Sequence, residues 1–376
     1  MTIEQIDSIR LAGEFISPDL TISSVCEIEG VLCINDLVPL SVADCSKSLQ
    51  RTLDIPIEDK TGRRIGSLCI CKDRTIDPSA FTLDQYVAFL VDSQTTSPPS
   101  DYQFLHNYVV IKKEYVLMYL STMQHSAPVW GGFVHTSRHT AIPPLVVSEE
   151  CLIVASDNIC LPTPVHERLA MRSVSSATPS ERYLQLYHQL ELLFDWVVVQ
   201  DIKNLSDDLL GAGKILSGYA SADLPRLNNL LTRYLLSPDS VVTKLGALRT
   251  YENEGKKIFQ DYGKDGNPLK EAWTKWMNCL QDGEPTETKV KQFKIPTDSS
   301  GYRGFIIRVT AYFIYRIRCC VAHSKIGEYV LRDTDEEFVV QFGEPLLRAV
   351  LVELLSHPKI LVYSDNRLVP DLWPVS

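Results

Sequence analysis

Apolar residues follow two different periods along the 376-residue chain. Up to about Val154 they occur in short β-rich runs that are broken by turn-forming glycines and prolines, as is typical of strands. These runs cover residues 31–34, 65–71, 108–112, 129–134, 145–147 and 152–154. Two helical patterns, at 81–92 and 113–123, lie among them. The first part of the chain is therefore predicted to be an α+β domain in which strands predominate.

From Glu181 onward the apolar residues recur every three or four positions, which places them on one face of a helix. In the first such helix they are Leu184, Tyr187, Leu190, Leu193, Phe194 and Val197. Further helical patterns cover residues 205–217, 223–236, 240–260, 269–280, 302–324 and 337–357, with a polar interruption at 281–300. This second part is predicted to be an all-α bundle.

The segment Ser-Val-Ser-Ser-Ala-Thr-Pro-Ser at 173–180 separates the two patterns. Small residues and proline predict a linker without a packed element. Two domains also suit the length, because single cores rarely grow past about 250 to 300 residues. We therefore expect a mostly β, α+β sensing or regulatory domain over residues 1–175 and a helical domain over residues 181–376.

The charge is uneven along the chain, which has a net charge of −10. Residues 1–180 carry 13 Lys and Arg against 21 Asp and Glu, whereas residues 181–376 carry 24 against 26. A global surface for polyanions is not indicated, so any nucleic-acid contact needs a local basic patch. The most apolar windows are much shorter than the roughly 20 residues of a membrane span, and we expect a soluble protein without a membrane partner.

Ten cysteines raise the question of disulfides or metal ligands. The opening Met-Thr-Ile-Glu lacks the basic and apolar segments of a secretory signal, so reduced thiols in the cytoplasm are expected. The cysteines lack Cys-x-x-Cys pairs, and His125, His135 and His139 have no suitably spaced carboxylate beside them. No phosphate-binding glycine motif occurs either. The sequence thus predicts no metal and no cofactor.

The strongest candidate chemistry lies in the predicted helix at 302–324, which contains Arg316, Arg318 and His323. Arg318 and His323 are five residues apart, about 140° around the helix, whereas Arg316 and His323 align. Histidine can move a proton near neutral pH, and a guanidinium can hold phosphate oxygens, so this pair suits metal-independent RNA cleavage. Spacing alone favours a simpler interpretation, in which these are solvated or ion-paired residues near a helix end.

Two segments resemble the HEPN superfamily, the higher eukaryote and prokaryote nucleotide-binding domains. The segment Tyr-Arg-Ile-Arg-Cys-Cys-Val-Ala-His-Ser-Lys at 315–325 is similar to the family pattern of an Arg, four to six residues, and a His in the last core helix. The segment Glu-Arg-Tyr-Leu-Gln-Leu-Tyr-His-Gln-Leu-Glu at 181–191 looks like the opening helix of bacterial members. The resemblance covers roughly half of the chain and leaves residues 1–175 unassigned.

The resemblance implies a HEPN-like helical bundle with Arg318 and His323 as its catalytic pair. It implies an endoribonuclease that needs no metal or cofactor and cuts tRNA or mRNA by attack of a ribose 2′-hydroxyl on the adjacent phosphate, leaving a 2′,3′-cyclic phosphate. It further implies a homodimer formed through this domain, and a role in antiviral defence or as a toxin effector. The supporting or RNA-binding candidates are Arg316, Cys319, Glu191 and Lys325.

Two alternatives stay open at this point. Cys319 stands where the family usually has Asn or another polar residue, and cysteine is a weak hydrogen-bonding partner. The domain could then be a non-catalytic HEPN domain that binds RNA or nucleotide, or only dimerises. Alternatively, the protein is an interaction protein whose amino-terminal domain meets an unknown trigger or partner and is itself the functional part.

Overall fold

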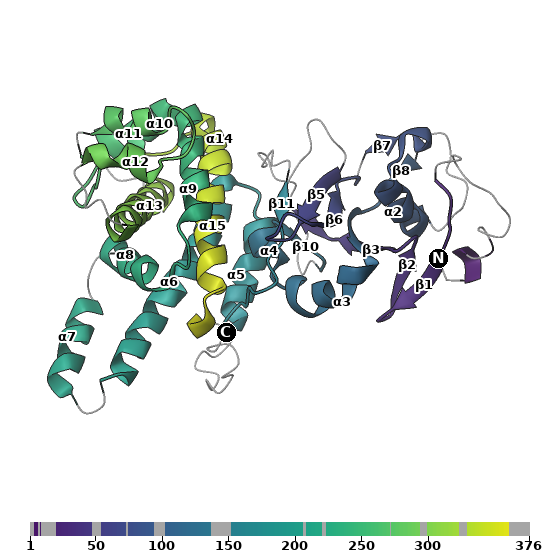
Figure 1. The fold of residues 1–376 in the computed structure, drawn as a ribbon, viewed down its shortest axis with the longest axis horizontal. Helices are drawn as coiled ribbons and strands as arrows, with labels where there is room; N and C mark the ends of the chain where they lie inside the picture. Colours follow the sequence, from purple (N-terminus) through teal and green to yellow (C-terminus); the bar gives the residue numbers. More distant parts are fainter. Residues whose placement is uncertain are drawn as a thin grey trace. The chain divides into compact units, whose positions relative to one another are not determined.

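The chain forms two compact units (Figure 1). The computed structural model describes residues 4–6, 8, 20–46, 54–72, 74–93, 102–136, 152–205, 208–219, 223–270, 272–293, 299–322 and 329–360. One unit, called the sheet unit below, consists of Met1–Pro143 and Val147–Ile159. The other, called the helical unit, consists of Pro144–Val146 and Cys160–Ser376.

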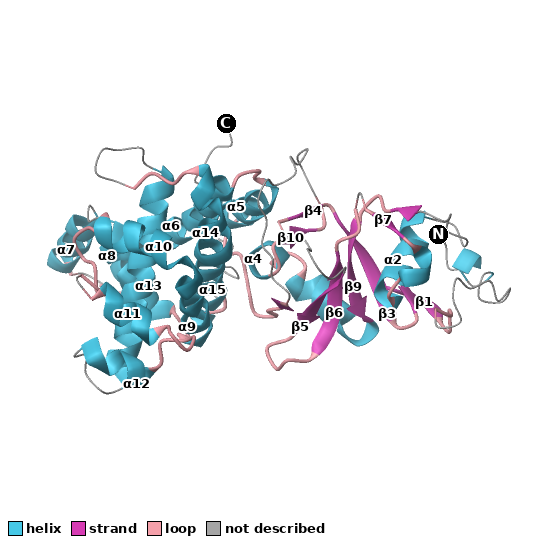
Figure 2. Cartoon of the chain, turned by 90° about the horizontal axis from the view of Figure 1, so that it is seen from above, coloured by secondary structure: helices cyan, strands magenta, loops and turns pink. Residues whose placement is uncertain are grey.

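A seven-stranded sheet organises the sheet unit (Figure 2). Its strands, in spatial order, are β1 (Val25–Ile28), β2 (Val31–Ile34), β3 (Leu37–Val42), β9 (Asn107–Lys112), β6 (Arg64–Cys69), β5 (Asp54–Glu58) and β11 (Ile153–Val154). Neighbouring strands are antiparallel, except that β11 runs parallel to β5. The central strand β9 is buried from Tyr108 to Ile111, as its apolar sequence requires.

Helix α2 (Leu83–Ser93) packs against one face of this sheet and supplies much of the core. It starts with a capping box: Thr82 Oγ1 accepts from the Gln85 amide at 3.1 Å, and Gln85 Oε1 accepts from the Thr82 amide at 3.2 Å. The remaining elements are β4 (Asp44–Cys45), β7 (Thr75–Ile76), η1 (Pro78–Ala80), β8 (Tyr102–Gln103), η2 (Lys113–Tyr115), α3 (Val116–Met118), η3 (Tyr119–Met123), α4 (Ala127–Trp130) and β10 (Phe133–Val134).

Helix α13 (Ser299–Ala322) is the central helix of the helical unit. Between residues 305 and 320 all of its side chains are buried except those of Arg308, Tyr315 and Arg318. It packs against α6 (Pro179–Lys203) and α8 (Asp223–Tyr234) (Figure 1). The other helical segments are α5 (Pro164–Ser175), α7 (Leu209–Tyr219), α9 (Asp239–Gly246), η4 (Ala247–Tyr251), α10 (Glu252–Lys256), η5 (Lys257–Asp261), α11 (Trp273–Cys279), α12 (Glu287–Val290), η6 (Lys291–Phe293), η7 (Asp333–Asp335), α14 (Glu336–Phe338), η8 (Val339–Gly343) and α15 (Glu344–Leu355).

Two buried polar contacts tie α6 to its neighbours. The Nε of Arg182 lies 3.0 Å from Oε1 of Glu344 at the start of α15, and both side chains are almost fully buried. One position further, the Tyr183 hydroxyl donates to the carbonyl oxygen of Ile314 on α13 at 3.0 Å. Because buried charges and hydroxyls need partners, these contacts fix the rotation of α6 about its axis.

The prediction of a sheet-rich first part and a mostly helical second part is confirmed. The division, however, falls between Ile159 and Cys160, earlier than the expected linker at 173–180. The small residues there pack instead of linking: α5 runs through Ser173 and Val174, both buried, and contacts α6 extensively.

Two further features differ from the expected elements. The predicted strand at 129–134 begins as helix α4, and only Phe133 and Val134 form a strand, in a two-stranded pairing with β4. The predicted strand at 145–147 lies outside the described residues. In the described ranges, seven cysteines have free thiols, namely Cys26, Cys33, Cys69, Cys71, Cys160, Cys279 and Cys319. Among the helices that can be described, none has the length and apolar character to cross a membrane.

Candidate functional site

Arg318 lies near the end of α13, where three helices come together. Its Nη2 is 3.3 Å from Oε1 of Glu191 on α6 and 3.6 Å from Oδ2 of Asp223, the first residue of α8. The guanidinium carbon stands 5.5 Å from the centre of the Tyr187 ring, also on α6. A cation over an aromatic face and between two carboxylates is held in one orientation. We call these residues, with His188, the Arg318 cluster.

His188 extends the cluster on the other side of Glu191. Its Nδ1 lies 2.6 Å from Oε2 of Glu191, and the two residues are three apart on α6. The side chain of His188 is 43% exposed, and that of Glu191 is 31% exposed. One carboxylate therefore bridges an imidazole and a guanidinium, with a separate oxygen for each.

The charges of the cluster shift the pKa values of its members. Burial by itself would raise the pKa of Glu191, but the hydrogen bond and charge of His188, together with Arg318, lower it below its ordinary value. Burial opposes the charge of Arg318, yet Tyr187, Glu191 and Asp223 raise its pKa further. Burial raises the pKa of Tyr187, so its hydroxyl stays neutral. At neutral pH the cluster thus presents an ionised Glu191 and a charged Arg318.

The other predicted residues of α13 have different surroundings. Arg316 is 1% exposed, and its Nη2 donates to the carbonyl oxygen of Tyr262 at 3.0 Å. Of the two roles expected for Arg316, support of the site or contact with RNA, its position in the interior favours support, because it holds the loop at 260–270. Cys319 is buried as well, and burial together with a hydrogen bond to it raises the pKa of Tyr315 to about 12. His323 and Lys325 lie outside the described residues.

A pocket of about 1140 Å³ adjoins the Arg318 cluster. It is lined by Leu224 and Pro225, which follow Asp223 on α8, by Tyr315, which lies one turn before Arg318, and by the loop at 260–270. Two hydrogen bonds hold this loop against α13. Arg316 donates to the Tyr262 carbonyl oxygen, and the Lys264 amide donates to the Tyr312 hydroxyl at 2.9 Å. We call this pocket the loop pocket.

The sequence pointed to Arg318 and Glu191 but missed His188 and Asp223. His188 stands three residues before Glu191 in the segment at 181–191, and that spacing puts the two side chains on one helix face. This signal was present in the sequence. In the sequence, Asp223 looks like any acidic residue in the first turn of a helix, where such residues are common. Its contact with Arg318 depends on the packing of α8 on α13.

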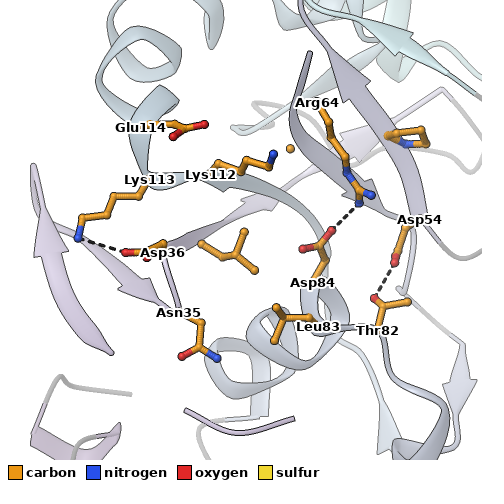
Figure 3. Close-up of a pocket in the computed structure, with 13 residues that line it drawn as sticks. Asn35, Asp36, Asp54, Arg64, Thr82, Leu83, Asp84, Lys112, Lys113 and Glu114 are labelled. Atoms are coloured by element: carbon orange, nitrogen blue, oxygen red, sulfur yellow. Dashed lines mark hydrogen bonds and ion pairs between the residues drawn. The ribbon is translucent and has the colours of Figure 1, made fainter. Parts of the chain in front are cut away.

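The sheet unit has a separate pocket of about 1180 Å³ at the amino-terminal end of α2, where Thr82, Leu83 and Asp84 line it (Figure 3). Two of its cations pair with acids, Arg64 with Asp84 at 2.9 Å and Lys113 with Asp36 at 3.2 Å. Lys112 also points into it from β9. Because both cationic and acidic groups line the pocket, its electrostatics favour neither an anion nor a cation.

The histidines that raised the question of a metal site do not converge. Both ring nitrogens of His135 contact protein atoms, Nε2 at 2.6 Å from the Tyr119 hydroxyl and Nδ1 at 2.7 Å from the Ser41 carbonyl oxygen. His125 is exposed, and His139 lies outside the described residues. In the described part of the chain, no group of three or more His, Cys, Asp or Glu residues is arranged to hold a metal ion.

Comparison of the chain with protein-family models, curated proteins and solved structures finds no match. The resemblance to HEPN domains therefore depends on the segments at 181–191 and 315–325 alone. Those two segments supply Glu191 and Arg318, which the fold brings into contact although they are far apart in the chain.

Proposed function

We propose that the helical unit is a metal-independent endoribonuclease of the HEPN type, which cuts RNA such as tRNA or mRNA in antiviral defence or as a toxin effector. The observation that carries the proposal is the orientation of Arg318 by Glu191 and Asp223 on a stripe of α13 that is not buried. An oriented guanidinium suits a phosphate group, because it presents several donors in one plane.

In the proposed reaction the 2′-hydroxyl attacks the adjacent phosphorus, the bond to the 5′-oxygen breaks, and a 2′,3′-cyclic phosphate remains. Arg318 stabilises the negative charge that develops on the phosphate oxygens. His323 transfers a proton, and Glu191 holds Arg318 in position. Each cleft would be completed by a second copy of the domain, as the resemblance implies.

The charge of the cluster bears on how RNA would reach it. Glu191 and Asp223 repel a phosphate while they orient Arg318, so affinity for the RNA backbone has to come from other cations. The loop pocket beside the cluster contains Lys264 and Lys270, together with the ring of Tyr315. We assign the nucleotide next to the cut bond to this pocket, since aromatic rings and lysines suit bases and phosphates.

A non-catalytic HEPN domain is the second candidate, and one observation favours it. Cys319 is buried where the family usually has a polar residue, so this position offers no side chain to the cleft. Such a domain would bind RNA or nucleotide, or dimerise, without cutting. Binding of RNA that stays intact would distinguish this candidate from the nuclease.

The test is to incubate the purified full chain with total tRNA and mRNA in EDTA and to map the product ends. Wild type is expected to leave cyclic phosphate ends. Arg318→Ala should lower the cleavage rate about 100-fold, equivalent to about 3 kcal/mol of transition-state stabilisation. Arg308→Ala is the matched control, because Arg308 is an exposed arginine of the same helix, and it should cut normally.

Intact RNA, together with a cellular phenotype that His323→Ala leaves unchanged, would contradict the proposal. A further outcome separates the two candidates: if wild type and Arg318→Ala bind the labelled RNA equally and neither cuts it, the non-catalytic alternative is supported.

A further inference from the structure

His188, Glu191 and Arg318 form a continuous chain of contacts across α6 and α13. The imidazole Nδ1 and the guanidinium Nη2 each reach a different oxygen of Glu191, at 2.6 Å and 3.3 Å. The other ring nitrogen of His188, Nε2, has no hydrogen-bond partner within the described ranges, and the side chain is 43% exposed. This nitrogen is therefore accessible to a molecule that binds over Arg318.

The carboxylate decides which nitrogen of His188 carries the proton. An ionised carboxylate can only accept hydrogen bonds, so Nδ1 must carry the hydrogen, and Nε2 of the neutral ring keeps its lone pair. The other charged groups at this place are Arg318 from α13 and Asp223 from α8. An imidazole that a carboxylate orients in this way is a common form of general base.

We infer that His188 is a catalytic base of the proposed ribonuclease reaction, and this inference rests on the proposed function. Nε2 of His188 removes the proton of the 2′-hydroxyl while its oxygen forms the new bond to phosphorus. The bond between phosphorus and the 5′-oxygen breaks, and that oxygen takes a proton from water. His188 ends protonated and returns its proton to water.

A purely structural role for the pair makes a different prediction. An exposed His–Glu pair three residues apart on a helix adds little to stability, so its removal would leave cleavage unchanged if it were only structural. The sheet unit offers a matched pair, because Nδ1 of His106 lies 3.0 Å from Oδ1 of Asp92 and its side chain is 53% exposed. His106→Gln is therefore the control for His188→Gln.

The experiment compares the full-length wild type with His188→Gln, Glu191→Gln and His106→Gln on total tRNA and on a fluorescent single-stranded RNA, in EDTA, over a range of pH. His188→Gln should lower kcat about 100-fold or more, because a general base contributes rate factors of this order. It should also remove the fall of the rate at acidic pH, because the base that must be unprotonated is then absent. Glu191→Gln should lower kcat about 10-fold, and His106→Gln should change nothing. Added imidazole should restore part of the activity of His188→Ala, which a structural defect would not allow.

The outcomes separate this inference from the function on which it rests. Absence of cyclic phosphate ends with wild type on every RNA removes the proposed function and the inference with it. Cleavage by wild type and by His188→Gln at rates within about threefold overturns the inference alone. An equal loss in His106→Gln, or no rescue of His188→Ala by imidazole, also overturns it.

Discussion

Each of the two units contains a pair of a histidine and a carboxylate, in different surroundings. In the sheet unit, Nδ1 of His106 lies 3.0 Å from Oδ1 of Asp92, and in the helical unit Nδ1 of His188 lies 2.6 Å from Oε2 of Glu191. The side chain of Asp92 is completely buried, whereas that of Glu191 is 31% exposed. The pairs therefore differ in the carboxylate and its access to solvent, and this difference decides what each pair can do.

Asp92 is a structural centre, because its two oxygens serve four groups. Besides His106, it accepts from the Tyr102 hydroxyl at 2.9 Å, the Leu105 amide at 2.7 Å and the Tyr108 hydroxyl at 2.8 Å. Burial and the hydrogen bonds to Asp92 raise the pKa of both tyrosines, so both remain donors. A carboxylate that is fully used by buried donors stabilises the fold and has nothing left for a substrate.

Among the described residues, the side chains paired with Glu191 are those of His188 and Arg318, and both are partly exposed. Oε2 of Glu191 holds the imidazole of His188, which is 43% exposed, and its Oε1 holds the guanidinium of Arg318, which is 20% exposed. The comparison teaches that a histidine–carboxylate pair indicates chemistry only when the carboxylate also orients a second reactive group and the imidazole can be reached.

The largest expected effect is that of Asp92→Ala on stability. The substitution leaves the Tyr108 hydroxyl and other buried donors without an acceptor, and we expect a loss of about 3 to 5 kcal/mol from the free energy of unfolding. Urea unfolding measures the loss in the free energy of unfolding. Hydrogen exchange of the Leu105 amide then shows whether the loss lies in the sheet unit. A loss below about 1 kcal/mol would mean that Asp92 is not a structural centre of the sheet unit.

A third histidine extends the comparison to an imidazole without any carboxylate. His166 on α5 is 2% exposed, and its Nδ1 lies 2.8 Å from Thr163 Oγ1. Burial lowers its pKa from 6.5 to about 4. The unfolded chain then binds the proton first as the pH falls, so the contribution of His166 is complete above pH 6.5 and is lost between pH 6.5 and about 4.

The next largest effect is expected from His166. Between pH 6.5 and about 4, the free energy of unfolding of the helical unit should fall by up to about 3 kcal/mol. The change of pH slope between wild type and His166→Met, measured by thermal unfolding at a series of pH values, isolates the contribution. Equal slopes for the two proteins would show that the buried imidazole is not the cause.

Part of the fold could be predicted from the sequence, because local apolar patterns are enough to predict long helices. The periodic apolar positions gave α6 and α13, and these carry Glu191 and Arg318. Strands β3 and β5 were missed since Pro39 and Pro56 interrupt them and proline usually argues against a strand within a sheet. Their pairing with β9 and β6 is a tertiary effect that outweighs this local preference.

The site divides in the same way. Arg318 and Glu191 were found through the two motif segments, but Asp223 lies on α8, and no spacing in the chain predicts that it will face Arg318. Arg316 shows the limit of helical periodicity most directly. It aligns with His323 on a helical projection, yet it is buried and donates to the carbonyl oxygen of Tyr262 in the loop at 260–270.

The smallest expected effect is that of Glu191→Gln on stability, and it is the one that separates the two carboxylates most sharply. The pKa of Glu191 is lowered in the folded protein, so its contribution to stability is present above its ordinary pKa of 4.5 and is lost as the pH falls through the lower folded value. Because solvent screens a pair exposed to this extent, the loss should stay below about 1 kcal/mol, against several for Asp92→Ala. Urea unfolding of both variants at neutral pH makes the comparison directly, and losses of equal size would show that Glu191 also serves mainly to hold the fold.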